Sequence, residues 1–115
     1  MMNEFPKGFF AKWQSQVKKG VLEYIILRIL KRKSYYGYEL IQDIEKYTQL
    51  KLAEGTIYPL LNRLKSEGLV KSKWVEMEAG IPRKYYEITT EGSLSILEMK
   101  EFMQNLNSSI QKLAK

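Results

Sequence analysis

The sequence contains no cysteine and no histidine. Without cysteine the chain has no disulfide and no thiolate chemistry, and without histidine it has no imidazole to act as a general base. Zinc sites built from neither residue are rare, so we expect no metal and no cofactor. The chain also lacks a glycine-rich phosphate loop and a clear pair of catalytic carboxylates. These absences argue against an enzyme.

Long hydrophobic runs are absent as well. No apolar stretch reaches the roughly 20 residues that span a bilayer, and the first residues, MMNEFPKGFF, do not form a secretory signal. We therefore expect a cytoplasmic protein. The 115 residues, of which 44% are hydrophobic and 28% charged, fit one folded domain with an appended element.

Positive charge dominates one part of the chain. The net charge is +6, and residues 1–88 carry all of the excess, because residues 89–115 contain three basic and three acidic side chains. A cationic domain attracts polyanions through its field and through counterion release. Charge alone does not distinguish duplex DNA from RNA or an anionic membrane surface.

Residues 54–68, EGTIYPLLNRLKSEG, are the most informative segment. The apolar residues Ile57, Leu60, Leu61 and Leu64 follow the i, i+3, i+4, i+7 spacing of an amphipathic helix, and Gly68 is placed to end it. The remaining face is polar and basic and carries Thr56, Tyr58, Pro59, Asn62, Arg63, Lys65 and Ser66. Such a face suits a DNA groove, although alone it also fits an ordinary solvated helix.

The neighbouring segments place this helix in a larger unit. Helical patterns precede it at residues 8–17, 21–30 and 36–46, with Gly37 allowing a close neighbour, and a basic hairpin follows it with strands at 69–77 and 83–88. Tyr85 and Tyr86 alternate across that hairpin, so we expect one in the core and the other exposed. The predicted fold is mainly α, with three helices followed by a small basic β-hairpin and then a long last helix over residues 90–115.

Thr90 is expected to cap this last helix. Its apolar residues are spaced by three and four positions in alternation, which is the heptad pattern of a coiled coil. We predict that these residues form a homodimer interface with a second copy of the chain: Ile96, Met99, Met103, Leu106, Ile110 and Leu113. The alternative is that the helix packs back on its own domain.

These segments together resemble the PadR family of bacterial winged helix-turn-helix transcription regulators, in the short form with a single C-terminal helix. The matching stretches are Gly20–Glu23, Ile26–Leu27, Tyr36–Leu40, Gly55–Leu61, Arg63–Leu64, Glu67–Val70, Trp74, Arg83–Tyr86, Thr89 and Gly92. The resemblance implies a winged helix-turn-helix over residues 1–89, with the hairpin as its wing, and a long C-terminal dimerisation helix over 90–115. It also implies a homodimeric repressor. Some relatives bind aromatic or cationic drugs at the dimer interface, with a tryptophan on the last helix, where this chain has Met103 beside Phe102.

In helix-turn-helix docking the second helix of the unit enters the major groove, and we assign that role to residues 54–67. The predicted contacts with double-stranded DNA are Tyr36, Thr56, Tyr58, Pro59, Asn62, Arg63, Lys65, Lys71, Lys73, Arg83 and Lys84. Asn62 suits adenine and Arg63 suits guanine, whereas the wing cations suit phosphates. Core packing remains the alternative for Tyr58, and a solvated surface charge the alternative for Arg63.

The predicted function is a sequence-specific DNA-binding transcription regulator, a homodimeric repressor on a pseudo-palindromic operator. We hypothesise that a small hydrophobic or aromatic molecule releases or modulates it through Trp13, Met99, Phe102 and Met103, since methionine-rich surfaces adapt to varied ligands. The alternative for these residues is a sealed dimer core. The alternative functions are a non-specific nucleic-acid binder and a winged-helix module that binds protein.

Overall fold

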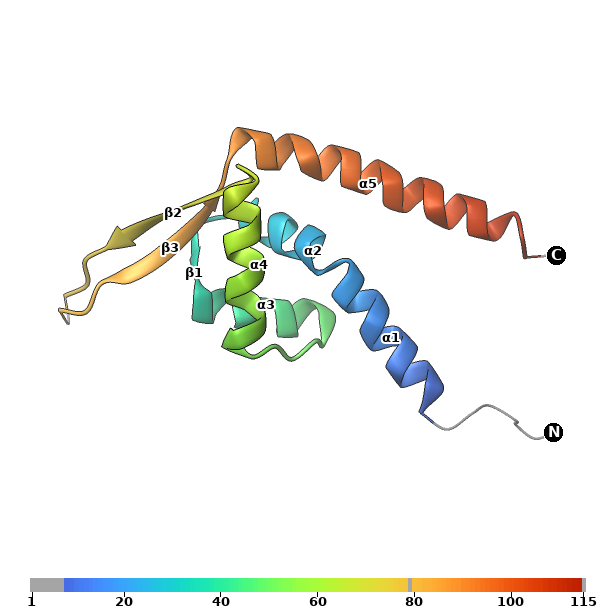
Figure 1. The fold of residues 1–115 in the computed structure, drawn as a ribbon, viewed down its shortest axis with the longest axis horizontal. Coiled ribbons are helices and arrows are strands. Elements are labelled where there is room, and N and C mark those ends of the chain that lie inside the picture. Colours follow the sequence, from blue (N-terminus) through green and yellow to red (C-terminus); the bar gives the residue numbers. More distant parts are fainter. Residues whose placement is uncertain (1–7, 79, 115) are drawn as a thin grey trace.

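The computed structural model describes residues 8–78 and 80–114. The elements in chain order are α1 (Phe9–Gly20), α2 (Leu22–Leu30), β1 (Tyr35–Tyr36), α3 (Gly37–Thr48), α4 (Glu54–Ser66), β2 (Val70–Val75), β3 (Arg83–Ile88) and α5 (Thr90–Gln111). The molecule is elongated, with principal extents of 62 × 30 × 21 Å. The β2–β3 wing projects from one side of the helical core, and α1 and α5 extend from the opposite side (Figure 1).

The core forms around α2, whose segment LEYIILRIL is apolar on most of its surface. Helices α3 and α4 pack against it with the apolar faces that the sequence predicts. The buried side chains from these three helices are Leu22, Ile26, Leu27, Ile29, Leu30, Leu40, Ile44, Ile57, Leu61 and Leu64. Because the apolar face of α4 points into this core, its polar face is left towards solvent.

The sheet has three strands in the order β1-β3-β2, all antiparallel. The sequence predicts only the hairpin and places Tyr36 in a helix, which is wrong. Tyr36 lies in β1 opposite Tyr85, and α3 begins one residue later, at Gly37. Two residues are too few for an alternating pattern, so this strand leaves no signal in the sequence. Tyr86 is buried, as expected for one of the two tyrosines. Tyr85 is half-buried rather than exposed, because the Tyr36 ring packs edge-on against it with 5.6 Å between the ring centroids.

Two glycines and a threonine set the path of the chain after α4. Gly68 has φ of 79° and follows the helix, as the sequence predicts. The cap of α5 is Thr89 and not Thr90: its hydroxyl accepts a 3.0 Å hydrogen bond from the backbone N–H of Gly92. A Cβ on Gly92 would lie 2.6 Å from Ile88 Cγ1, so this glycine lets α5 begin tight against the sheet.

Only the first turns of α5 belong to the core. Ile96 is buried and Met99 half-buried against α2, and Lys31 donates a 3.1 Å hydrogen bond to Ser93 Oγ. Further along, Leu106 and Ile110 are 45% and 52% exposed. The helix ends at Gln111, so Leu113 lies beyond it. In the described part of the chain, no helix combines the length and apolarity needed to cross a membrane.

Candidate nucleic-acid interface

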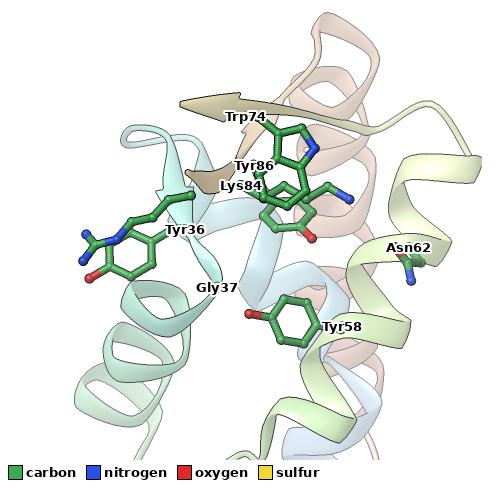
Figure 2. Close-up of a pocket in the computed structure, with 8 residues that line it drawn as sticks. Tyr36, Gly37, Tyr58, Asn62, Trp74, Lys84 and Tyr86 are labelled. Carbon is green, nitrogen blue, oxygen red and sulfur yellow. The ribbon is translucent and has the colours of Figure 1, made fainter. Parts of the chain in front are cut away.

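A depression of about 480 Å³ lies between α4 and the wing (Figure 2). It is lined by Tyr36, Gly37, Tyr58, Asn62, Trp74, Arg83, Lys84 and Tyr86. We call it the wing cavity. Its described lining contains two cations, three tyrosines and an amide, and no aspartate or glutamate. Donors and positive charge without a competing carboxylate suit a phosphate group.

The floor of the wing cavity depends on Gly37 and Tyr58. A Cβ added to Gly37 would lie 2.7 Å from Cζ of Tyr58, so only glycine leaves room for that ring at the start of α3. Tyr58 is half-buried and packs against the core, while its hydroxyl points towards Gly37 (Figure 2). Tyr58 therefore serves packing, which the sequence left as an alternative, and still lines the wing cavity.

The Tyr86 hydroxyl lies above Tyr58 in the same cavity (Figure 2). Burial raises the pKa of Tyr86, and the nearby Tyr58 raises it further. Tyr86 therefore keeps its proton at neutral pH and remains a hydrogen-bond donor. A donor at this depth of the cavity suits an anionic oxygen.

The predicted wing cations do not share one face of the sheet. Side chains alternate along a strand, so Lys84 and its cross-strand partner Trp74 face the wing cavity, whereas Lys71 and Lys73 face the other way. Lys73 Nζ lies 3.3 Å from Glu87 Oε2 on that second face. Arg83 alternates to the same face as Lys73, yet it reaches the cavity rim, where its guanidinium lies 4.2 Å from the centre of the Tyr36 ring. The structure thus brings only Arg83 and Lys84 to the wing cavity.

The predicted contacts on α4 are also divided. Asn62 lines the wing cavity, and Thr56, Pro59 and Lys65 are exposed outside it. Arg63 lies on the other flank of the helix, where its Nε is 3.4 Å from Glu23 Oε2 of α2 and its side chain is 68% exposed. An ion pair this exposed contributes little stability, typically about 0–1 kcal/mol. The contact through Nε leaves both terminal nitrogens of Arg63 available to another anion.

Three lining residues were not among the predicted DNA contacts: Gly37, Trp74 and Tyr86. Trp74 and Lys84 are cross-strand partners, so their side chains lie on the same face of the hairpin. The sequence could have placed Trp74 in the interface only if the register of the two strands were known. That register depends on how the two strands pair, which the residues of one strand do not reveal.

A second cavity, of about 410 Å³, lies between the α1–α2 junction and α5. It is lined by Gly20, Val21, Glu23, Tyr24, Glu98, Met99, Phe102 and Met103. Three of the four residues predicted to bind a small ligand meet here. The fourth, Trp13, is exposed on α1 and is not among the lining residues.

Helix α3 followed by α4 and a basic hairpin defines a winged helix-turn-helix, the architecture of a large class of DNA-binding proteins. Residues 26–98 match the model of the PadR-like family of transcriptional regulators. The chain belongs to this family, and is thus a DNA-binding transcriptional regulator rather than a member of an enzyme family. The predicted family and fold class are therefore confirmed.

Solved structures of this family are similar over most of the chain. A PadR-like transcription factor from Bacteroides fragilis is 37% identical, with a TM-score of 0.75 over 89% of this chain and 98% of that one. A PadR family regulator from Eggerthella lenta is 30% identical, with a TM-score of 0.83 over 92% of each chain. The transcriptional regulator YqjI of Escherichia coli is 34% identical over 94 residues, and the match spans only 44% of its length.

Proposed function

We propose that the protein is a homodimeric, sequence-specific repressor that binds a pseudo-palindromic operator. The observation that carries this proposal is the wing cavity, a cationic and aromatic depression beside the polar face of α4. A DNA backbone seated in it would be held by Arg83, Lys84 and the tyrosine hydroxyls. The exposed residues of α4 would then enter the adjacent major groove, where Asn62 and Arg63 are the candidates for base contacts.

Dimerisation is supported by the apolar residues that α1 and α5 leave in solvent. Phe9, Phe10 and Trp13 are exposed on α1, and Phe102, Leu106 and Ile110 on α5. Exposed apolar residues on a helix surface mark an interaction site, and the heptad spacing on α5 fits a second α-helix. The two helices project away from the wing, so a partner held there would leave both wing cavities open to DNA (Figure 1).

The second cavity supports an effector site. Met99, Phe102 and Met103 supply an apolar and adaptable surface beside the α1–α2 junction, next to the proposed dimer helices. A hydrophobic or aromatic molecule bound there would regulate transcription if it favoured one separation of the two recognition helices. Calorimetric titration with aromatic compounds tests this part, which fails if no compound gives heat or changes operator affinity.

Binding to labelled duplex DNA from the region upstream of the gene tests the main proposal. We expect tight binding to that duplex, at least a hundredfold weaker binding to a scrambled duplex, and a loss of about 1–3 kcal/mol in Arg63→Ala if this residue reads a base. Equal affinity for the scrambled duplex would instead support a non-specific binder. No binding even at low salt would support a protein-interaction module.

A further inference from the structure

Trp74 on β2 is not among the predicted DNA contacts, although its side chain lines the wing cavity. Its side chain is 67% exposed, yet it lines the wing cavity together with Tyr58 and Asn62 (Figure 2). Indole is the largest apolar side chain, and water is a poor environment for it unless a partner covers it. Helices α1 and α5 leave the core on the opposite side, so a dimer built on them would not cover this residue (Figure 1).

We propose that Trp74 packs against a deoxyribose of the DNA strand whose phosphate occupies the wing cavity. This inference rests on the proposed function in one respect, namely that the cavity receives the DNA backbone. Sugar and phosphate alternate along a strand, and the wing presents a matching pair: Trp74 lies directly across the sheet from Lys84, whose Nζ is 5.8 Å from the indole centre. The cation suits the phosphate, and the flat apolar ring suits the neighbouring sugar.

The chemistry of the cavity favours a sugar over a base. A base can stack on an aromatic side chain only when it is unstacked from its neighbours, and an intact duplex does not offer one. The sugar–phosphate strand lies on the outside of the duplex, where a ring on the wing can reach it while α4 occupies the groove. Trp74 is thus a positioning contact that aligns the wing on the backbone and does not read sequence.

The proposal predicts a distinct dependence on salt. A lysine that neutralises a phosphate releases counterions, so its removal lowers the slope of log affinity against log salt by about one. An apolar contact with a sugar releases none. Trp74→Ala should therefore weaken operator binding about tenfold, as expected for the loss of a buried apolar contact, with an unchanged slope. Lys84→Ala should weaken binding and lower the slope. Trp74→Phe, which keeps a smaller ring, should retain most of the affinity.

Intrinsic fluorescence gives an independent readout, because the chain has only two tryptophans. The variant Trp13→Phe leaves Trp74 as the sole indole, and because Trp13 belongs to the proposed dimer surface, its operator affinity is first compared with that of the wild type. Titration of this variant with operator duplex should change the Trp74 emission and saturate at the same stoichiometry as anisotropy of labelled DNA. Leu97→Ala truncates an exposed apolar residue of α5 that lies, at 100° per residue, on the side away from Leu106 and Ile110. It is the matched control and should bind like the wild type. Thermal melting shows whether each variant is folded.

The outcomes separate this inference from the proposed function. If the wild type binds its operator specifically but Trp74 emission stays constant at saturation, or Trp74→Ala binds as tightly as wild type, the inference is wrong and the repressor proposal stands. A changed salt slope in folded Trp74→Ala would also overturn it, since the loss would then come from a displaced cation. If the wild type binds no duplex, both proposals fail.

Discussion

Gly37 is the residue whose identity matters most for the shape of the wing cavity. Its missing side chain gives the Tyr58 ring a place at the start of α3, with 2.7 Å between the would-be Cβ and Tyr58 Cζ. The clash after substitution would involve the end of a side chain and not backbone. The ring can therefore move aside, into the space where DNA would bind.

Gly37→Ala is accordingly expected to lower the free energy of unfolding by roughly 1 kcal/mol, at the low end for an overpacked site. It should also weaken operator binding, because the displaced Tyr58 ring would occupy part of the wing cavity. Urea unfolding and DNA anisotropy measure the two effects. Gly20→Ala is the control, because nothing lies within 4 Å of its Cβ position; its stability should be unchanged or slightly higher. If Gly37→Ala matched the wild type in both measurements, Tyr58 would not depend on this glycine.

The buried Tyr35 predicts a dependence of stability on alkaline pH. Burial, together with a 2.6 Å hydrogen bond donated to Asp43 Oδ2, raises the pKa of Tyr35 to about 12. In the unfolded chain the pKa is about 10. The folded state thus favours the neutral hydroxyl, so this contribution to stability is complete below pH 10 and is lost as the pH rises from about 10 to 12.

Tyr35→Phe should lose about 1.5 kcal/mol at pH 7, since a hydrogen bond to a charged acceptor is removed. It should also lose stability less steeply than the wild type between pH 10 and 12. Urea unfolding at a series of pH values tests both effects, with the exposed Tyr38→Phe as the comparison. Parallel curves for Tyr35→Phe and wild type in this pH range would contradict the assignment.

Among the elements, α5 has two parts with different surroundings. Its first turns pack on α2, and its later turns carry Leu106 and Ile110 in solvent. The double variant Leu106→Glu/Ile110→Glu should leave the fold intact, because neither residue contacts the described core. It should abolish the proposed dimer, because two pairs of like charges would face each other in an apolar seam.

Loss of the dimer removes the second half-site contact, so affinity for a two-half-site operator should fall at least a hundredfold. Analytical ultracentrifugation and anisotropy check the assembly and the binding. Ser108→Glu places the same charge on the opposite side of α5, given 100° per residue, and should change neither. A double variant that still sediments as a dimer would mean that another surface holds the two copies together.

At the scale of the whole molecule, the dimer proposal fixes a distance on the DNA. Two α4 helices held by paired α5 helices would reach half-sites about one helical turn apart, roughly 10 base pairs. Insertion of five base pairs between the half-sites turns one of them to the far side of the duplex. Affinity should then fall to that of a single half-site, and insertion of ten base pairs should restore part of it.

Gel shifts with duplexes of graded spacing measure this dependence. The comparison duplex carries five substitutions, and no insertion, between the half-sites. Affinity that does not change with spacing would show that the α4 helices of the two subunits bind their half-sites independently.

The sequence by itself determined the fold class and the position of α4. The apolar spacing of Ile57, Leu61 and Leu64 sets which face of α4 is buried, and Gly68 sets where the helix ends. Such features depend on residues within one or two turns of each other, so a linear pattern reveals them. The same local reasoning found the apolar spacing of α5, but it wrongly placed Ile96 in the dimer interface, since Ile96 and Met99 pack against the core of their own chain.

Only the tertiary structure decided which of the candidate residues meet. It added β1, turned Lys71 and Lys73 away from Lys84, paired Arg63 with Glu23 and brought Trp74 into the wing cavity. These outcomes depend on strand register and on contacts between residues far apart in the chain, such as Tyr35 and Tyr86. A pairing shifted by one residue would send every wing side chain to the other face, and no periodicity within a single segment specifies that choice.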